Sequence, residues 1–368
     1  MNATSSPTTF RLIACYYRPL LMAVAASVLL GTFWFASRYP QLLSKADHVG
    51  QDLPTMAYGS EVIHVAVDAP IWQRILYGAV NWLDGMKIGM TFGVMFGALL
   101  HTYLRYYPIK IGNNLYLNSL KGALVGIPMG VCANCAVPTA CGVTRGHGRV
   151  EVALGFLFSS PNFNPVVMFM TFAALPLAMG LVKYAVLLTT ILFIVPFLIS
   201  WLERKEPLKP FAIGAEGESC VITPYSDGEC TDTFRQVFHE LTLNFGKNIW
   251  MLVKPTLTIM LLASVASSAI LTLVPLNDLL AQVTPLQLAI VAFIAVLMPV
   301  PIALDVMFAA MLFRHGVAAN YVMLFAMTLG TYSIIPSIYL WREVSKKLAV
   351  SLFVYFMIVG WLTGMAFN

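Results

Sequence analysis

The chain contains 368 residues, of which 59% are hydrophobic and only 11% are charged, and its mean hydropathy is +0.78. An average soluble domain has about a quarter of its residues charged, so this composition excludes a soluble protein and predicts an all-α integral membrane protein with the lipid bilayer as a partner. The net charge of +5 is spread over short loops. Because no run of Lys or Arg is long enough to follow a phosphate backbone, nucleic acid is excluded as a partner.

Nine apolar stretches follow one another along the chain. A helix needs about 20 apolar residues to cross the roughly 30 Å of bilayer hydrocarbon, and each stretch reaches or approaches this length. The N-terminus has no small-residue cleavage site, so we interpret the first stretch as a retained span and not as a signal peptide. The sequence predicts a polytopic protein with eight or nine transmembrane segments. They are Pro19–Ser37, Gly85–Leu104, Gly122–Val143, Val150–Ala174, Leu181–Leu202, Trp250–Val274, Leu286–Phe313, Ala318–Trp341 and Leu348–Phe367.

Two polar intervals, Arg38–Asp84 and Glu203–Asn248, separate groups of these stretches. We expect the second to be a flexible connector, since its Cys220 and Cys230 lack a further ligand that would complete a metal site. No metal and no cofactor are predicted. The intervals divide the chain into an N-terminal transmembrane helix with an extramembrane loop (1–84), a first membrane repeat (85–202), a hydrophilic linker (203–248) and a second membrane repeat (249–368).

The two membrane halves carry similar features in the same order. A basic turn precedes a proline by 20 positions from Arg145 to Pro165 and by 22 from Arg314 to Pro336. We interpret this agreement as two related halves with interrupted helices. Paired interruptions mark the solute sites of many transporters, because backbone freed by Pro or Gly must be buried in protein or line a water-filled cavity. They are predicted at "CANCAVP" (132–138), "SSPNFNP" (159–165), "MPVP" (298–301) and "GTYSIIP" (330–336).

Three cysteines, Cys132, Cys135 and Cys141, lie close to Pro138 within one apolar stretch. On a continuous helix the first two would share a face and the third would not. Soft thiolates suit trivalent arsenic or antimony, mercury and copper(I), a C-x-x-C pair can also cycle through a disulfide, and a cysteine can simply pack as a small apolar residue. We expect these cysteines, with Asn134 and Pro138, to contact a solute.

Four further polar side chains, Ser159, Ser160, Asn162 and Asn164, accompany the double proline of the second interruption. Polar groups at this depth either join helices to one another or coordinate a ligand. We expect them to coordinate the solute, because the interruption removes the backbone's own hydrogen bonds.

Asp305 is the only carboxylate that lies deep inside a predicted apolar run. A charge at that depth is costly and usually faces a cavity, a cation or a proton path. Asp305 is therefore predicted either to couple a proton to transport or to form a structural ion pair with Lys254, Lys183 or Lys87. The basic residues of the two turns, Arg145, Arg149 and Arg314, are predicted to gate the path or attract an anion, with a solvated turn as the alternative.

The region from Gly126 to Pro165 resembles the predicted permease family that includes bacterial organoarsenical efflux permeases. In that family a cysteine cluster precedes a proline, a basic glycine-bearing turn follows, and an "FL…(S/T)P…NP" interruption comes next. Here these parts read "CANCAVP", "TRGHGR" and "FLFSSPNFNP". The chain departs from the family pattern in separating its first two cysteines by two residues and in adding Cys141. The first span and its following loop look like additions to the family.

The resemblance implies a multi-pass permease with eight or so family helices in a bacterial inner membrane. Its better-studied members are similar in exporting trivalent organoarsenicals through their cysteines. By that match Cys132 and Cys135 are the thiol pair, and Pro161, Asn164 and Pro165 belong to the second interruption. The chain has no nucleotide-binding glycine loop, no HExxH and no Ser-His-Asp set, so an enzyme is not predicted.

The sequence as a whole predicts a secondary permease that exports a small soft solute, either a thiol-reactive metalloid or a sulfur-containing species. Two other classes of function stay open. One is a membrane thiol–disulfide redox component, and the other is a scaffold subunit of a membrane assembly. A homo-oligomer is compatible with each of them.

Overall fold

The computed structural model describes residues 7–47, 62–66, 68–106, 112–147, 149–204, 233–274 and 279–367. For residues 7–16, 45, 105 and 144–147 it describes the backbone alone. Within these ranges all regular structure is helical and no strand occurs, which confirms the predicted all-α class.

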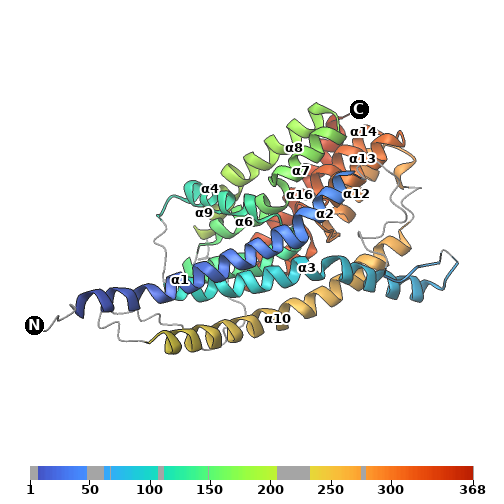
Figure 1. Cartoon of the computed structure of the whole chain (residues 1–368). Coiled ribbons are helices and arrows are strands. Elements are labelled where there is room, and N and C mark those ends of the chain that lie inside the picture. The colour runs from blue at the N-terminus through green and yellow to red at the C-terminus, as the bar shows by residue number, and fades with distance from the viewer. Residues whose placement is uncertain are drawn as a thin grey trace, which may run out of the picture.

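Three long helices run along one another in Figure 1: α1 (Pro7–Phe33), α3 (Ile71–Tyr106) and α10 (Phe234–Leu273). A π-helical turn, η1 (Trp34–Arg38), continues α1 into α2 (Tyr39–Asp47). The remaining helices lie beside this group (Figure 1). They are α4 (Leu115–Gly126), η2 (Ile127–Met129), α5 (Ala133–His147), α6 (Val150–Asn162), α7 (Pro165–Ala174), α8 (Leu177–Thr189), η3 (Thr190–Ile194), α9 (Val195–Glu203), α12 (Pro285–Leu297), α13 (Leu304–Arg314), α14 (Ala319–Thr328), α15 (Ile334–Tyr339), η4 (Leu340–Val344) and α16 (Lys346–Ala366).

In the part of the chain that the structure describes, five helical segments are long and apolar enough to cross a membrane. A sixth is added if α6 and α7, bent by 48° relative to each other, form one broken span. The protein is therefore multi-pass, and the finer count of eight or nine segments stays a prediction. The five segments that are long enough are Tyr17–Ser44, Ile71–Leu104, Leu177–Glu203, Phe234–Leu273 and Lys346–Ala366. Several of the other predicted spans are divided into shorter helices.

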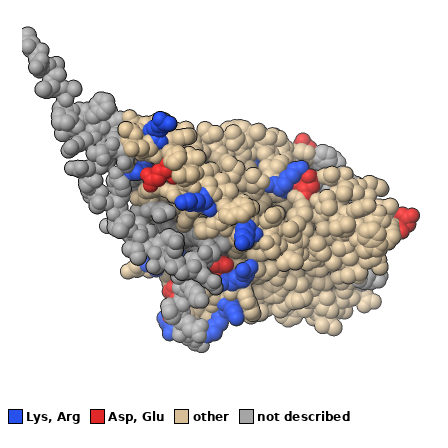
Figure 2. Space-filling view, turned by 90° about the horizontal axis from the view of Figure 1, so that it is seen from below, with Lys and Arg blue, Asp and Glu red and all other residues tan. Residues whose placement is uncertain are grey.

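The outer surface has the composition expected for contact with lipid. Large apolar side chains are exposed, among them Phe35 (80%), Phe169 (70%) and Leu286 (71%). Figure 2 shows a broad face with few Lys, Arg, Asp or Glu side chains in view, while most visible charges gather toward one side. Lipid tails can solvate such a face, whereas water cannot do so cheaply.

Four interruptions divide the shorter helices, at residues 127–132, 163–164, 298–303 and 329–333. Three of them contain a residue with left-handed backbone: Gly130 (φ 58°), Ala303 (φ 65°) and Gly330 (φ 75°). In the fourth, Asn164 Oδ1 accepts a hydrogen bond from Val166 N at 3.0 Å and so begins α7. These four segments together are called the break region below.

The first interruption does not lie at Pro138, where the sequence pattern predicted it. Helix α5 continues through Pro138, and the break precedes the helix at residues 127–132. A helix tolerates a proline when neighbouring groups compensate for the lost hydrogen bond. Here α3 packs very closely on α5, since a Cβ placed on Gly93 would lie 2.2 Å from Cys135 O, and one on Gly97 would lie 2.4 Å from Pro138 O. Because Gly93 and Gly97 have no side chains, the backbones of α3 and α5 touch, and this contact holds α5 in place.

The polar intervals are shorter in the structure than in the sequence pattern. Helix α3 begins at Ile71 and α10 begins at Phe234, each inside a predicted polar interval. Thr233 and Gln236 form a capping box at the start of α10, which explains why a hydrophilic segment begins a long helix. Cys220 and Cys230 lie outside the described residues.

Candidate functional site

Residues of the break region hydrogen-bond to the ends of α5 and α6 across long distances in the sequence. Asn134 Nδ2 donates to Val300 O at 3.2 Å, and Asn134 Oδ1 accepts from Ser333 Oγ at 2.6 Å. Thr331 Oγ1 donates to Asn162 Oδ1 at 3.4 Å. All these side chains are buried. The structure therefore brings the interruptions before and after α13 and α14 into contact with the ends of α5 and α6.

Cys132 is the last residue of the first interruption, and Cys135 lies in the first turn of α5. Their Sγ atoms are 2.7 Å apart, and the two residues are 2% and 1% exposed. Cys135 N also donates to Cys132 Sγ at 3.4 Å, so a thiol takes the position of the helix cap. A helix N-terminus stabilises negative charge, and cysteines at such positions carry thiolate character. We call these two cysteines the thiol pair.

Arg38 lies beside the thiol pair, and the sequence pattern did not predict it as a site residue. A Cβ placed on Gly89 of α3 would lie 2.9 Å from Cys135 Sγ and 3.1 Å from Arg38 Nη2, so both atoms border the same point. The guanidinium interacts electrostatically with Cys132 and Cys135. Arg38 is 6% exposed, although the sequence pattern assigned it to a polar loop. Its signal in the sequence was the apolar "YPQLL" that follows it.

The structure does not bring Cys141 to the thiol pair. Cys141 follows Cys135 by six positions in the helix, which is about 9 Å along the helix axis. Cys141 is fully buried and interacts electrostatically with Tyr339 of α15. Pro138 lies between Cys135 and Cys141 inside α5. Two of the three predicted thiols thus form a unit, and the third lies apart.

The polar side chains of "SSPNFNP" divide into two groups. Ser159 Oγ donates to Ala123 O of α4 at 2.9 Å, which is a contact between helices. Ser160 Oγ accepts from Val131 N at 3.3 Å, and this bond joins the last turns of α6 to the first interruption. Asn164 differs, because its buried Nδ2 makes no hydrogen bond. That nitrogen would lie 2.9 Å from a Cβ on Gly130, so it faces the first interruption.

Asp305 forms an ion pair with Lys183 of α8. Lys183 Nζ and Asp305 Oδ2 are 2.5 Å apart, and their side chains are 0% and 5% exposed. Lys183 is one of the three partners predicted for this carboxylate. Asp305 lies in the first turn of α13, where the helix dipole also stabilises its charge. Gly330 lies against its carboxyl group, since a Cβ there would be 3.2 Å from Asp305 Cγ.

Asp305 is not the only deeply buried carboxylate. Glu151, in the first turn of α6, is 1% exposed, and the sequence pattern missed it because it lies next to the basic turn. Glu151 Oε1 accepts from Asn118 Nδ2 at 2.9 Å and lies 3.8 Å from Arg149 Nη1. A polar cluster at the start of α6 therefore satisfies this carboxylate.

The predicted gating arginines lie at helix ends. Arg149 Nη2 donates to Asn113 Oδ1 at 2.7 Å, outside the break region. Arg314 is exposed in the last turn of α13. The side chain of Arg145 lies outside what the structure describes. A gating role for the three stays a prediction.

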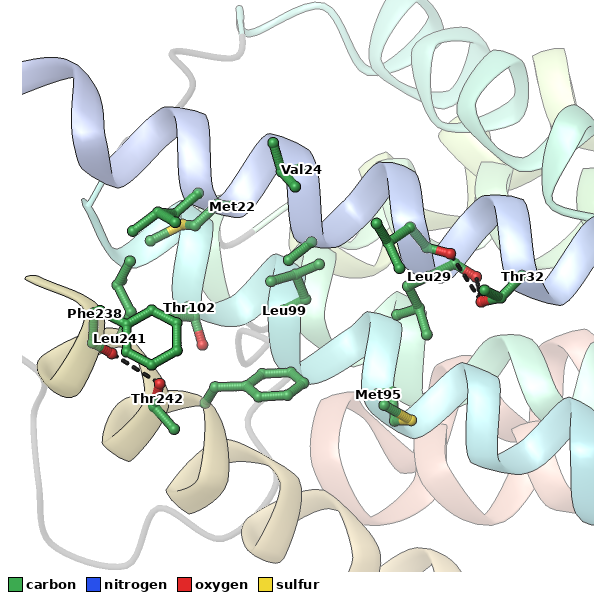
Figure 3. A pocket seen from close by; sticks show the side chains of 14 residues that line it. Met22, Val24, Leu29, Thr32, Met95, Leu99, Thr102, Phe238, Leu241 and Thr242 are labelled. Carbon is green, nitrogen blue, oxygen red and sulfur yellow. Dashed lines mark hydrogen bonds between the residues drawn. The ribbon is translucent and has the colours of Figure 1, made fainter. Parts of the chain in front are cut away.

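An apolar cavity of about 540 Å³ lies between α1, α3 and α10 (Figure 3). Its walls include Met22, Leu99 and Phe238. The hydroxyls of Thr32 and Thr242 donate to backbone carbonyls of their own helices, as the dashed lines show. The cavity thus offers little polarity to a solute and suits an acyl chain. It contains none of the predicted site residues.

Within the described residues, no group of three or more His, Cys, Asp or Glu side chains could hold a metal ion.

Comparison with known proteins gives one family and one curated relative. UPF0718 protein YraQ of Escherichia coli (strain K12) is 29% identical over 146 residues, which are 37% of this chain and 42% of that protein. The chain therefore matches less than half of this relative's length. No solved structure matches. The model of the ArsP_1 family, described as "Predicted permease", matches residues 90–368, which confirms the resemblance inferred from residues 126–165, and the chain belongs to this permease family.

Proposed function

We propose that the protein is a secondary permease that exports a small soft solute, either a thiol-reactive metalloid or a sulfur-containing species, through the break region. One observation carries this proposal. In a chain of a permease family, a buried pair of thiols with sulfurs 2.7 Å apart lies where interrupted helices meet. Soft thiolates bind trivalent arsenic and similar species through two sulfurs at once. The same proposal places the protein in a bacterial inner membrane.

The groups beside the thiol pair suit a solute that carries oxygen as well as a soft centre. Asn164 Nδ2 is buried, makes no hydrogen bond and faces Gly130. A buried donor of this kind is costly unless a ligand or water accepts from it. Asn134, Ser160 and Asn162 surround the same region through the bonds described above.

The order of elements supports two related halves around this path. In the first half α4, an interruption, α5, a turn, α6, an interruption and α7 follow one another. In the second half α12, an interruption, α13, a turn, α14, an interruption and α15 do the same. Repeats of this kind in transporters enclose a solute site between them and alternate its access.

Asp305 and Lys183 are the groups that we propose couple transport to a proton. A proton on Asp305 would remove one charge of a buried pair and leave Lys183 uncompensated. That state is high in energy unless α8 and α13 move apart and admit water. Protonation can therefore drive a change in the break region, which Asp305 contacts through Gly330.

A direct test is uptake of trivalent methylarsenic by everted membrane vesicles. We expect uptake by the unaltered protein and none by the variant with Cys132→Ser and Cys135→Ser. The matched control is Cys141→Ser, which removes a buried cysteine of the same helix outside the thiol pair and should keep uptake. No uptake by any folded version would overturn the arsenical cargo, and equal uptake by the double variant would overturn the role of the thiols.

A second candidate function is a membrane thiol–disulfide redox component. The specific observation in its favour is again the short distance between the thiols, since a C-x-x-C pair this close can be oxidised with little movement. Two electrons and two protons would pass to a partner oxidoreductase. A thiol state that varies in cells with the redox condition, together with absent transport, would favour this function.

A further inference from the structure

Arg38 is a buried cation without an acidic partner among the residues that the structure describes. Its side chain touches a neutral environment, with Nη1 3.5 Å from Gln41 Oε1 and the guanidinium 4.8 Å from the centre of the Phe33 ring. Arg38 Nε is buried and makes no hydrogen bond. A buried charge is destabilising unless an opposite charge compensates for it. The structure therefore calls for a negative charge close to Arg38.

The thiol pair is the group that lies in the right place to supply this charge. Arg38 interacts electrostatically with both thiols. The other charged side chains of the adjacent part of α3, Asp84 and Lys87, form an ion pair with each other. Among the described residues, the groups that interact electrostatically with Arg38 and could carry the negative charge are Cys132 and Cys135.

Two features of the thiol pair itself independently favour a negative charge. Cys132 occupies the N-terminal cap of α5, where the backbone amide of Cys135 donates to its sulfur at 3.4 Å. The two sulfurs lie 2.7 Å apart, so a thiol on one can donate a hydrogen bond to a thiolate on the other and stabilise it.

The helix that carries Arg38 is fixed at this point. Phe33 stacks on Phe92 of α3 with ring centres 3.8 Å apart, and Trp34 Nε1 donates to Pro128 O at 2.8 Å. Leu42, one turn past Arg38, is fully buried. By contrast, only 11% of the most apolar 18-residue stretch of this helix is buried inside the protein. Its docking thus concentrates around Arg38, and this segment lies outside residues 90–368, which the permease family matches.

We infer that Arg38 stabilises a single thiolate shared by Cys132 and Cys135, so that the N-terminal helix completes a charge-paired nucleophilic site for soft electrophiles. The inference rests on the proposed solute site and gives it a chemical class of ligand. With a trivalent organoarsenical that carries two hydroxyl groups, two As–S bonds form and two As–O bonds break. The thiol proton leaves with one hydroxyl as water, the other hydroxyl leaves as hydroxide, and arsenic keeps its oxidation state.

The experiment is alkylation of the full-length protein in detergent by iodoacetamide, followed by mass spectrometry of the peptide that contains the thiol pair. In the reaction a thiolate attacks carbon and iodide leaves. We expect Arg38→Gln to slow alkylation at neutral pH about tenfold and to move its pH profile upward by about one unit, because only the thiolate reacts. Arg38→Lys should retain most of the reactivity. The control Arg18→Gln removes an arginine of the same helix that pairs with Glu240, and it should leave the profile unchanged.

A second measurement decides the matter if the reagent does not reach the buried sulfurs. The infrared S–H stretching band of the protein is compared with that of the variant with Cys132→Ser and Cys135→Ser. A shared thiolate predicts that the band loses the intensity of one thiol. Loss of two thiols' intensity, or an alkylation profile that Arg38→Gln leaves unchanged, would overturn the inference. Neither measurement uses transport, so failure of the permease proposal would be seen separately.

Discussion

Lys183 of α8 and Asp305 of α13 form a buried ion pair that joins segments 122 residues apart in the sequence, with Nζ and Oδ2 separated by 2.5 Å. The pair lies next to the break region through Gly330. Its strength depends on both charges being present, because each was removed from water when the protein folded.

Asp305→Asn should destabilise the protein by about 3–5 kcal/mol, since it leaves the Lys183 cation buried and uncompensated. Thermal unfolding in detergent measures this change. The variant with both Lys183→Met and Asp305→Asn should recover most of the loss. Asp84→Asn is the control, because the pair of Asp84 and Lys87 is partly exposed, and it should cost no more than about 1 kcal/mol. Equal stability of the single and double variants would contradict the prediction.

Gly93→Ala should destabilise the contact between α3 and α5 by about 1–3 kcal/mol, because the added methyl group would meet Cys135 O. The methyl group also pushes the thiol pair away from Arg38, so uptake of the solute should fall. Gly31→Ala in α1 is the matched control, since no atom lies within 4 Å of the added carbon. It should leave stability unchanged or raise it slightly. Both variants are compared by thermal unfolding and by vesicle uptake.

Trp34→Phe should lower the free energy of unfolding by about 1 kcal/mol, because it removes the donor to Pro128 O while it keeps an aromatic ring. The same change at Trp250, which is 71% exposed, should stay within about 0.5 kcal/mol. Chemical denaturation in detergent with intrinsic fluorescence of the remaining tryptophans provides the measurement. If the two variants do not differ, Trp34 does not fix the first interruption.

Gly330→Ala should destabilise the protein more than Gly316→Ala. Both glycines have left-handed backbone, with φ of 75° and 71°, and each substitution should cost about 1–2 kcal/mol for that reason. Only the carbon at position 330 meets another group, Asp305 Cγ at 3.2 Å, whereas position 316 faces open space. A larger loss of stability and of uptake at position 330 would link the carboxylate to the break region. Equal effects would limit the cost to the backbone.

The sequence was sufficient for the class of fold and for part of the site. Length and apolarity of the segments predict helices in a membrane, and Pro and Gly mark most of the interruptions. The C-x-x-C spacing places Cys132 and Cys135 on one helical face, and the structure has them together. Lys183 was one of several cations that could reach Asp305, and sequence spacing alone could not choose among them.

The features that the sequence did not predict depend on contacts between segments that are distant in the chain. Pro138 remains inside α5 because Gly93 and Gly97 let another backbone cover it, which no local rule for proline foresees. Asn134 finds Val300 and Ser333 only after the helices pack. Arg38 belongs to a segment whose docking is decided by ring contacts and by one indole hydrogen bond, so its burial could not be read from its own neighbourhood.

Most of the apolar surface of α1 is exposed to the bilayer, although the same helix continues to Arg38 beside the thiol pair. The apolar cavity of about 540 Å³ beside α1 is open to acyl chains, and a second of about 360 Å³ also borders this helix. Lipids that fill these spaces would lie along α1, which continues through η1 to Arg38. The contacts of Phe33, Trp34 and Leu42 would then hold the guanidinium beside the sulfurs while lipids exchange along the rest of the helix.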